Sequence, residues 1–216
     1  MKTYKTIYQL QVANDEIKKS KFIATAMPVP NKAAAEEWIK EIQRQYKDAT
    51  HNVFAYRVVE NGVLLERQSD DGEPSGTAGM PILEVLRGEE LTSVAVVVTR
   101  YYGGTLLGTG GLTQAYGRTA KLSLYDIIEK SPYKRYVVTT DYSQMGQVQY
   151  EVLQDGHILH DTVYTDAVEF IIYVAEQNAG AFVKKIANVT SGTAQVVEDA
   201  VVYGFYYGGE FMTSDE

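Results

Sequence analysis

Hydrophobic and polar residues alternate along several short segments of the N-terminal half, and this period of two predicts strands. Strands are expected over residues 3–12, 22–27, 52–59 and 63–68. The last two flank Glu60-Asn61-Gly62, and Asn-Gly is the strongest short signal for a hairpin. The segment from Ser93 to Tyr102 is continuously apolar and rich in β-branched residues, which predicts a central strand buried on both faces.

Helical periodicity separates these strands. Asn31 is a candidate N-cap for a helix that continues to about Tyr46. Apolar residues recur on one face of that helix, namely Ala35, Trp38, Ile39, Ile42 and Tyr46. A short helix is expected over residues 78–86, and a longer one over residues 112–130 that ends before Pro132, since proline cannot continue a helix.

After Pro132 the pattern becomes strand, helix, strand, strand, helix, strand, which is the ferredoxin-like βαββαβ order. The segments lie at residues 134–141, 143–154, 158–165, 167–175, 178–189 and 193–203. The chain is therefore predicted to be an α+β protein with an N-terminal domain over residues 1–131 and a ferredoxin-like domain over residues 132–216.

The composition of the chain excludes several classes of protein but does not identify its function. None of the 216 residues is cysteine, which excludes disulfides, thiolate nucleophiles and cysteine-ligated metal sites. The net charge is −8, and all of it lies in residues 132–216, which hold four basic and twelve acidic residues. This acidity argues against strong nonspecific DNA binding but allows a basic patch on the neutral N-terminal half. No apolar run has the length of a signal sequence or a membrane span, so a cytoplasmic protein without membrane contact is expected.

Glycine marks the candidate site, because ten of the 18 glycines fall between Asp70 and Arg118. Glycine is used where a backbone turns tightly or where another group approaches closely. In the second of two clusters, the apolar strand leads through glycines to a helix, an arrangement that directs backbone N–H groups at an anion. Its candidate residues are Gly103, Gly104, Gly108, Thr109, Gly110 and Gly111, with charge from Arg100 and Arg118. The spacing matches neither a P-loop nor a dinucleotide fingerprint, and a tight strand-to-helix connection without a ligand is the alternative.

The first glycine cluster adds three carboxylates, Asp70, Asp71 and Glu73. They are able to hold a hard cation, to remain solvated, or to pair with Arg67 or Arg100, and we expect no metal and no cofactor. His51 opens a strand of the N-terminal domain, from which it is able to face these clusters. Histidine, carboxylates and an anion-binding loop suffice for acid–base chemistry if they meet in space. Ser75 does not lie in a nucleophile-elbow pattern, so a serine hydrolase is not expected. No catalytic residue is assigned.

Four segments taken together resemble the Impact/YigZ family. They are residues 20–24, residues 49–56, the first glycine cluster from Asp70 to Gly79, and the second from Thr99 to Leu112. They occur in the family's order and cover most of residues 18–120. The resemblance implies an N-terminal fold like the second domain of ribosomal protein five of the small subunit, and a C-terminal domain similar to the last domain of elongation factor G. It also implies a cytoplasmic protein linked to translation.

The resemblance does not carry every role across. Eukaryotic Impact restrains the kinase of general amino-acid control through an additional N-terminal domain, which this chain is expected to lack. The favoured expectation is a non-enzymatic protein that binds RNA or the ribosome through its N-terminal domain, with lysines near residues 18–21 and with Tyr101 and Tyr102 available for base stacking. Two alternatives stay open: an enzyme or sensor for a small phosphate-containing ligand at the glycine loop, and an acidic domain that docks on a basic protein. The oligomeric state is left open.

Overall fold

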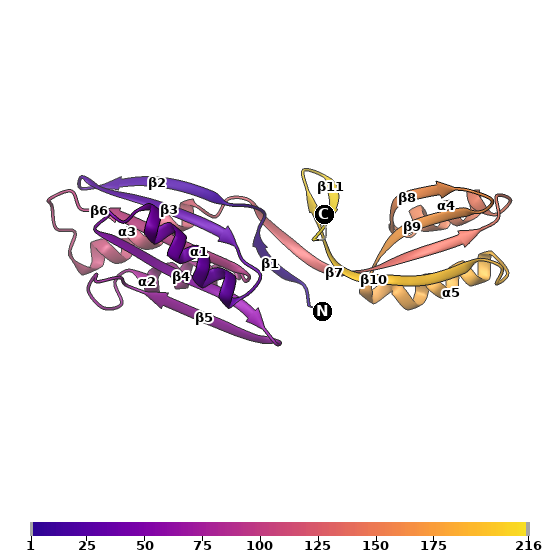
Figure 1. The fold of residues 1–216 in the computed structure, drawn as a ribbon, viewed down its shortest axis with the longest axis horizontal. Helices are drawn as coiled ribbons and strands as arrows, with labels where there is room; N and C mark the ends of the chain where they lie inside the picture. Colours follow the sequence, from indigo (N-terminus) through magenta and orange to yellow (C-terminus); the bar gives the residue numbers. More distant parts are fainter. Residues whose placement is uncertain (1, 215–216) are drawn as a thin grey trace. The chain divides into compact units, whose positions relative to one another are not determined.

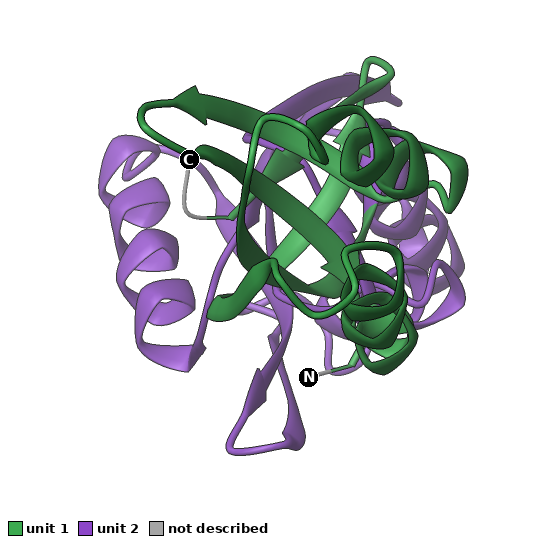
Figure 2. Cartoon of the chain, turned by 90° about the vertical axis from the view of Figure 1, so that its right-hand side faces the viewer, with its two compact units in different colours: residues 1–3, 129–216 green, residues 4–128 purple. Residues whose placement is uncertain are grey.

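The computed structural model describes residues 2–214, which form two compact units. Unit 2 holds residues 4–128 and unit 1 holds residues 1–3 and 129–216 (Figure 2). The predicted boundary at Ser131-Pro132 falls inside one long strand, β7 (Ile127–Thr140), through which the chain passes from unit 2 to unit 1. The mixed α/β class predicted from the sequence is confirmed.

Unit 2 is a five-stranded antiparallel sheet with helices on both faces (Figure 1). The strand order is β2-β3-β6-β4-β5. Its strands are β2 (Gln11–Ile17), β3 (Ser20–Pro28), β4 (His51–Glu60), β5 (Val63–Ser69) and β6 (Val94–Tyr101), and the short β1 (Tyr4–Ile7) pairs with β7. Its helices are α1 (Lys32–Gln45), α2 (Gly79–Gly88) and α3 (Gly108–Leu122).

The two faces of this sheet follow the period of two in β6. Val94, Val96 and Val98 pack in one core with α2 and α3, whereas Ala95 and Val97 pack in a second core with α1. Every residue from Val94 to Arg100 is buried, so the prediction of a central strand is confirmed. Because β6 lies in the middle of the sheet, its last residues, Arg100 and Tyr101, are placed between β3 and β4.

Several local predictions are also confirmed. The side chain of Asn31 accepts a hydrogen bond from the backbone N–H of Ala34 at 2.9 Å and so caps α1. Asn61 and Gly62 both have positive φ in the turn between β4 and β5, as a two-residue hairpin requires. The single strand predicted over residues 3–12 is instead two strands, β1 and β2.

The helix predicted over residues 112–130 is wrong at both ends. It begins earlier, at Gly108, and stops at Leu122, and residues 127–130 belong to β7. The side chain of Gln11 accepts a hydrogen bond from the backbone N–H of Tyr125 at 2.9 Å, and the backbone of Asp126 pairs with Tyr8. These pairings with the N-terminal segment draw the chain out of the helix, and Ile128 is buried while Ile127 is exposed, as in a strand.

Unit 1 has the predicted βαββαβ order. After β7 come α4 (Met145–Gln154), β8 (Ile158–Tyr164), β9 (Val168–Ala175), a 3-10 turn at Glu176–Asn178, α5 (Ala179–Val189), β10 (Gln195–Tyr207) and β11 (Glu210–Thr213). The sheet order is β11-β10-β7-β9-β8, with antiparallel neighbours, and α4 and α5 share one core with β7 and β9. This order is compatible with the ferredoxin-like prediction. None of the helices within residues 2–214 has the length and apolar content needed to cross a bilayer.

Candidate functional site

Three side chains lie in a row across the three central strands of the unit 2 sheet, β3, β6 and β4, near the end of β6. Arg100 on β6 is opposite Phe22 on β3 and opposite His51 on β4 in the strand registers. Residues directly opposite one another project from the same face of a sheet. This face is the one covered by α2 and α3, so the row lies beneath the segments that carry both glycine clusters.

The buried carboxylate of Glu73 is the centre of the site. Its Oε1 accepts a hydrogen bond from Arg100 Nη1 at 2.5 Å and another from the Tyr116 hydroxyl at 2.8 Å. The Nε2 atom of His51 is 3.8 Å from the same oxygen. Burial and the neighbouring negative charge of Glu73 raise the pKa of Tyr116, so this hydroxyl remains a donor at neutral pH. The sequence offered Glu73 as a partner for Arg100, and the structure joins them.

His51 is held in one tautomer by the first glycine loop. Its Nδ1 is 2.7 Å from the backbone carbonyl oxygen of Asp71. A carbonyl oxygen only accepts hydrogen bonds, so Nδ1 carries the proton. In the neutral ring, Nε2 is then an acceptor, and it is the ring nitrogen nearest Glu73.

Arg100 is 5% exposed and is fixed from several sides. Its Nη2 donates to the hydroxyl of Ser20 at 3.3 Å, and its guanidinium carbon lies 5.5 Å from the ring centres of both Phe22 and Tyr102. Its Nε is buried and has no hydrogen-bond partner within the described chain. A buried charge is tolerated only when it is paired, so Arg100 and Glu73 depend on each other.

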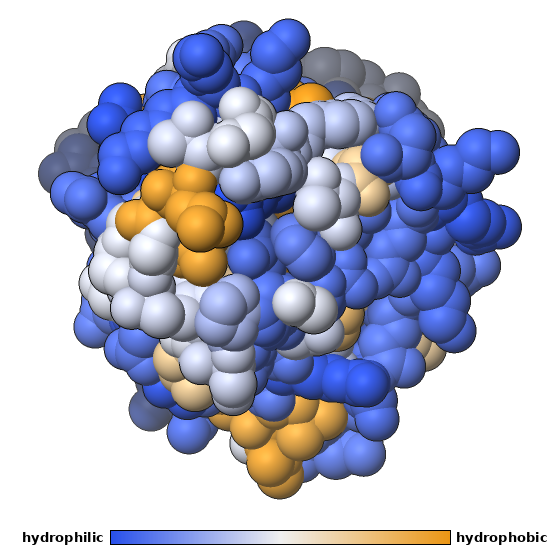
Figure 3. All heavy atoms as spheres, turned by 90° about the vertical axis from the view of Figure 1, so that its left-hand side faces the viewer, coloured by the Kyte–Doolittle hydropathy of each residue, from blue (hydrophilic) through white to orange (hydrophobic). Residues whose placement is uncertain are grey.

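A cavity of about 420 Å³ opens beside this pair. It is lined by Thr50, His51, Glu73, Pro74, Arg100, Tyr102, Leu106, Leu107, Gly108, Thr109 and Leu112. These residues come from β4, from the loop before α2, from the end of β6 and from the start of α3. Figure 3 views the end of unit 2 where the β2–β3 turn and the segment before α3 lie, and hydrophobic patches there are surrounded by a largely hydrophilic surface. Leu106 is 81% exposed.

The other two carboxylates of the first cluster shape the loop. Asp70 accepts hydrogen bonds from the backbone N–H groups of Gly76, Ala78 and Gly79 at 2.8–3.0 Å. Burial by itself opposes ionisation of Asp70, but these three amides outweigh it and lower its pKa. Asp71 Oδ2 accepts from the backbone N–H of Asn52 at 2.6 Å. Neither residue lines the cavity, and the three acids point to different partners.

The glycines of the second cluster have different surroundings. A Cβ on Gly103 would lie 2.0 Å from the carbonyl carbon and oxygen of Lys19, so only glycine fits there. Gly104 and Gly108 have positive φ, whereas Gly110 and Gly111 are in the first turn of α3. Of these five, Gly108 alone is among the residues that line the cavity.

A second hollow of about 350 Å³ is lined by Lys19, Lys21, Tyr101 and Tyr102. We call these four residues the lysine–tyrosine surface. Lys21 is opposite Tyr101 in the β3–β6 register. The hydroxyl of Tyr101 donates to Asp48 at 3.1 Å, and Tyr102 is 45% exposed and lines both hollows.

The predicted site residues therefore divide into two groups. The cavity brings together His51, Glu73, Arg100, Tyr102, Gly108 and Thr109. It does not include Asp70, Asp71, Tyr101, Gly103, Gly104, Gly110, Gly111 or Arg118. Arg118 instead forms an ion pair from an exposed position on α3, with its Nε 3.1 Å from Oδ2 of Asp15.

Sequence reasoning missed three polar or aromatic contributors. Tyr116 follows Leu112 by four residues and so has the spacing of a core residue, and its contact with the Phe22 ring, 5.3 Å between ring centres, fits that reading. Ser20 and Thr50 lie in two of the segments that resemble the Impact/YigZ family, residues 20–24 and 49–56, but no role was predicted for either side chain. Nothing in their local pattern indicated that they approach Arg100 and Tyr102.

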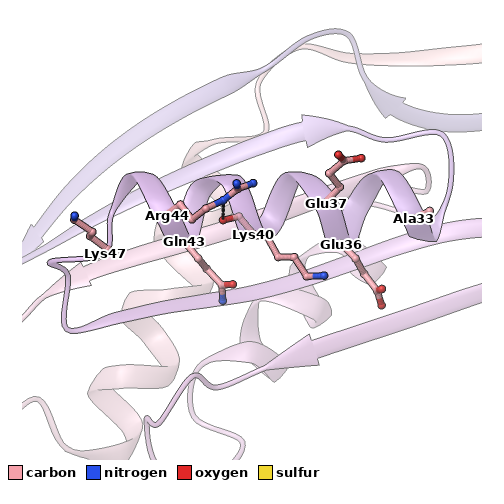
Figure 4. Close-up of a pocket in the computed structure, with 7 residues that line it drawn as sticks. All are labelled: Ala33, Glu36, Glu37, Lys40, Gln43, Arg44 and Lys47. Atoms are coloured by element: carbon pink, nitrogen blue, oxygen red, sulfur yellow. Dashed lines mark hydrogen bonds between the residues drawn. The ribbon is translucent and has the colours of Figure 1, made fainter.

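The exposed face of α1 has a hollow between long side chains, but the polar groups that line it do not converge on one point. Figure 4 shows Glu36, Glu37, Lys40, Gln43 and Arg44 spread along the helix and Lys47 just after its end. Arg44 Nε donates to the Lys40 carbonyl oxygen at 3.2 Å. Charges of both signs alternate there on exposed side chains, which is typical of a solvated helix face.

Comparison with known proteins matches both parts of the chain. Residues 18–124 match the Impact N-terminal domain, and residues 138–193 match a domain of unknown function, DUF1949. The IMPACT family member YvyE of Bacillus subtilis is 37% identical over 87% of this chain and 87% of its own length. The IMPACT family member YigZ of Escherichia coli is 33% identical over 85% of this chain and 91% of its own length. A solved structure titled as a hypothetical protein is 29% identical, with a TM-score of 0.58 over 93% of this chain and 98% of that one.

Proposed function

The chain belongs to the Impact family, and from that premise we propose that it is a cytoplasmic, non-enzymatic regulatory protein linked to translation. In this proposal unit 2 binds RNA, either free or within the ribosome, and unit 1 does not carry the RNA contact. The lysine–tyrosine surface is the observation that supports it.

The lysines on and next to this surface are free to meet phosphate. Lys18, Lys19 and Lys21 are exposed, and none forms an ion pair with any residue in the described range 2–214. Glu16 is opposite Lys21 in the β2–β3 register but makes no ion pair with it. Elsewhere in unit 2, Lys5, Arg67, Arg87, Arg118 and Lys121 are each paired with a carboxylate. Unpaired lysines next to the exposed Tyr102 and the half-buried Tyr101 offer phosphate neutralisation and base stacking together.

The turn that carries two of these lysines is strained. Lys18 and Lys19 form the two-residue turn between β2 and β3, and both have positive φ, 47° and 67°. Asn-Gly is preferred in such turns because the left-handed conformation is unfavourable for long side chains. Residues held in unfavourable conformations are concentrated at functional sites. Lysine at both positions is therefore explained better by binding than by stability.

The net charge of the chain agrees with this division of roles. The −8 belongs to residues 132–216, whereas residues 1–131 hold sixteen basic and sixteen acidic residues. The net negative charge of residues 132–216 repels a phosphate backbone. Residues 1–131 have no net charge, and their exposed lysines near residues 18–21 are able to attract it.

A fluorescence titration of a short unpaired RNA with the full chain tests the proposal at low salt. The double variant Lys19→Ala/Lys21→Ala is compared with Lys40→Ala/Lys47→Ala, which removes two exposed lysines at α1 that also have no ion pair within residues 2–214. We expect the first variant to bind at least tenfold more weakly and the second to bind as the parent does. Equal weakening by both, or no binding by the parent, contradicts the proposal.

A small phosphate-containing ligand in the cavity, bound by an enzyme or sensor, is the second candidate. It is favoured by Gly108 and Thr109, which line the cavity from the N-terminal end of α3, where the helix dipole attracts anions. It is opposed by the buried carboxylate of Glu73 on the same cavity. A thermal-shift screen of nucleotides and sugar phosphates decides, since a ligand at 100 times its Kd adds about 2.7 kcal/mol of stability. An unchanged melting temperature throughout the screen rejects this candidate.

A further inference from the structure

The cavity beside Glu73 presents hydrogen-bond acceptors to whatever enters it. Glu73 Oε1 is occupied by Arg100 and Tyr116, but Oε2 has no hydrogen-bond partner within the described chain. When the His51 ring is neutral, its Nε2 is a second acceptor, because Nδ1 faces the Asp71 carbonyl oxygen and carries the proton. Arg100 meanwhile donates from Nη1 to Glu73 and from Nη2 to Ser20, and its buried Nε is a donor with no partner within residues 2–214. A ligand that satisfies these acceptors must bring its own N–H or O–H donors.

The remaining walls are apolar and partly aromatic. Leu106, Leu107, Leu112 and Pro74 line the cavity, and Tyr102 adds an aromatic ring. A volume of about 420 Å³ lies within the range of small-molecule sites. Apolar walls with an aromatic ring and a few polar groups are the means by which proteins hold an unstacked base and read its Watson–Crick edge.

The cavity and the surface proposed to bind RNA share one residue, Tyr102. Tyr102 lines both the cavity and the hollow formed with Lys19, Lys21 and Tyr101. One face of its ring is near the Arg100 guanidinium, and the residue is still 45% exposed. Tyr102 is thus the residue through which an RNA strand on the lysines would meet the cavity.

We propose that the cavity receives one unpaired base of the RNA bound on the lysine–tyrosine surface, and that guanine is the base it prefers. This inference rests on the proposed function and deepens it. Guanine carries two N–H donors side by side, on ring N1 and exocyclic N2, and a carboxylate with a free oxygen accepts from both. Uracil has one ring donor and no amino group. An inorganic phosphate brings no comparable donors and meets the Glu73 charge, so it is the weaker fit.

Two variants separate the base pocket from the rest of the surface. Glu73→Gln removes the carboxylate that accepts the guanine edge. Because Glu73 also pairs with the buried Arg100, Thr109→Trp serves as a second variant that fills the cavity from an exposed position on α3. Gln114→Trp adds the same bulk to an exposed α3 residue that does not line the cavity and is the matched control.

The full chain is titrated with oligouridine, with the same oligomer carrying one guanosine, and with one carrying inosine, which lacks the N2 amino group. Free guanosine, inosine and uridine are titrated separately by NMR.

We expect the guanosine oligomer to bind about tenfold more tightly than the inosine oligomer, in keeping with the loss of one hydrogen bond to a charged group. Thr109→Trp and Glu73→Gln should abolish that preference, and Gln114→Trp should retain it.

The outcomes separate this inference from the proposed function. Equal binding of all three oligomers, with no effect of Thr109→Trp, overturns the base pocket and leaves RNA binding in place. Binding of free guanosine without binding of any oligomer supports the pocket and overturns RNA binding. Absence of binding in both titrations overturns both.

Discussion

Gly103 and Lys19 touch through their backbones. A Cβ on residue 103 would lie 2.0 Å from the carbonyl carbon and oxygen of Lys19, and the N–H of Gly103 donates to the hydroxyl of Ser20 at 3.2 Å. That same hydroxyl accepts from Arg100. The segment after β6, the lysine turn and the buried arginine are thus fixed to one another, which joins the cavity to the lysine–tyrosine surface.

Replacing Gly103 with alanine should separate these parts. The added Cβ meets backbone atoms that have no room to rotate away, and overpacking of this kind costs about 1–3 kcal/mol. Urea unfolding should show a lower midpoint. Gly110→Ala is the control, because a Cβ at Gly110 meets nothing within 4 Å and alanine favours a helix. Equal stability of the two variants would mean that the contact between residues 103 and 19 is not maintained in solution.

Relieving the strain in the lysine turn should stabilise the fold and weaken binding. Lys18→Asn/Lys19→Gly places in the turn the pair that tolerates positive φ, where each left-handed residue costs about 1–2 kcal/mol. Thermal unfolding should therefore move to higher temperature while the affinity for unpaired RNA falls. A stabilised variant that binds RNA as tightly as the parent would show that the strain serves no purpose in binding.

Removing the hydroxyl of Tyr116 should expose the dependence of Glu73 on its donors. Tyr116→Phe keeps the buried ring against Phe22 but removes a hydrogen bond to a buried carboxylate, at a cost of about 1.5–3 kcal/mol. Tyr125→Phe, at a residue 60% exposed, is the control and should unfold at the parent's denaturant concentration. Similar small effects in both variants would remove Tyr116 from the Glu73 network.

Acid should weaken unit 2 through Asp70. Its pKa is lower in the folded chain than in the unfolded chain, so its stabilising effect is fully present above the ordinary aspartate pKa and is lost as the pH falls through the lower, folded value. Between the two values the unfolded state binds more protons, and stability rises with pH there. The free energy of unfolding should fall less steeply below about pH 4 in Asp70→Asn than in the parent. Identical slopes would contradict the role of the three amides.

Local patterns predicted local structure well. The cap at Asn31, the Asn61-Gly62 turn and the buried strand β6 depend on neighbours a few residues away, and each is as expected. The end of α3 was missed because Gln11, more than a hundred residues earlier, captures the backbone of Tyr125. Such pairings leave no mark on the local sequence.

The candidate site was predicted in part for the same reason. The sequence drew attention to His51, Glu73 and Arg100, and strand register then placed His51 opposite Arg100. It also suggested Arg118 and the acids at residues 70 and 71, but these have other partners in the structure. Tyr116 escaped notice because its hydroxyl makes its contact inside a helix face that otherwise has the pattern of a core.

The salt dependence of RNA binding tests the central claim most directly. The affinity of the full chain for an unpaired RNA is measured across a series of salt concentrations, for the parent and for Lys19→Ala/Lys21→Ala. Each lost phosphate contact on a single strand should make the slope of log affinity against log salt less steep by about 0.7. The account predicts a clear slope for the parent and a shallower one for the variant. A parent whose affinity does not change with salt, or a variant whose slope equals the parent's, would contradict RNA binding at the lysine–tyrosine surface.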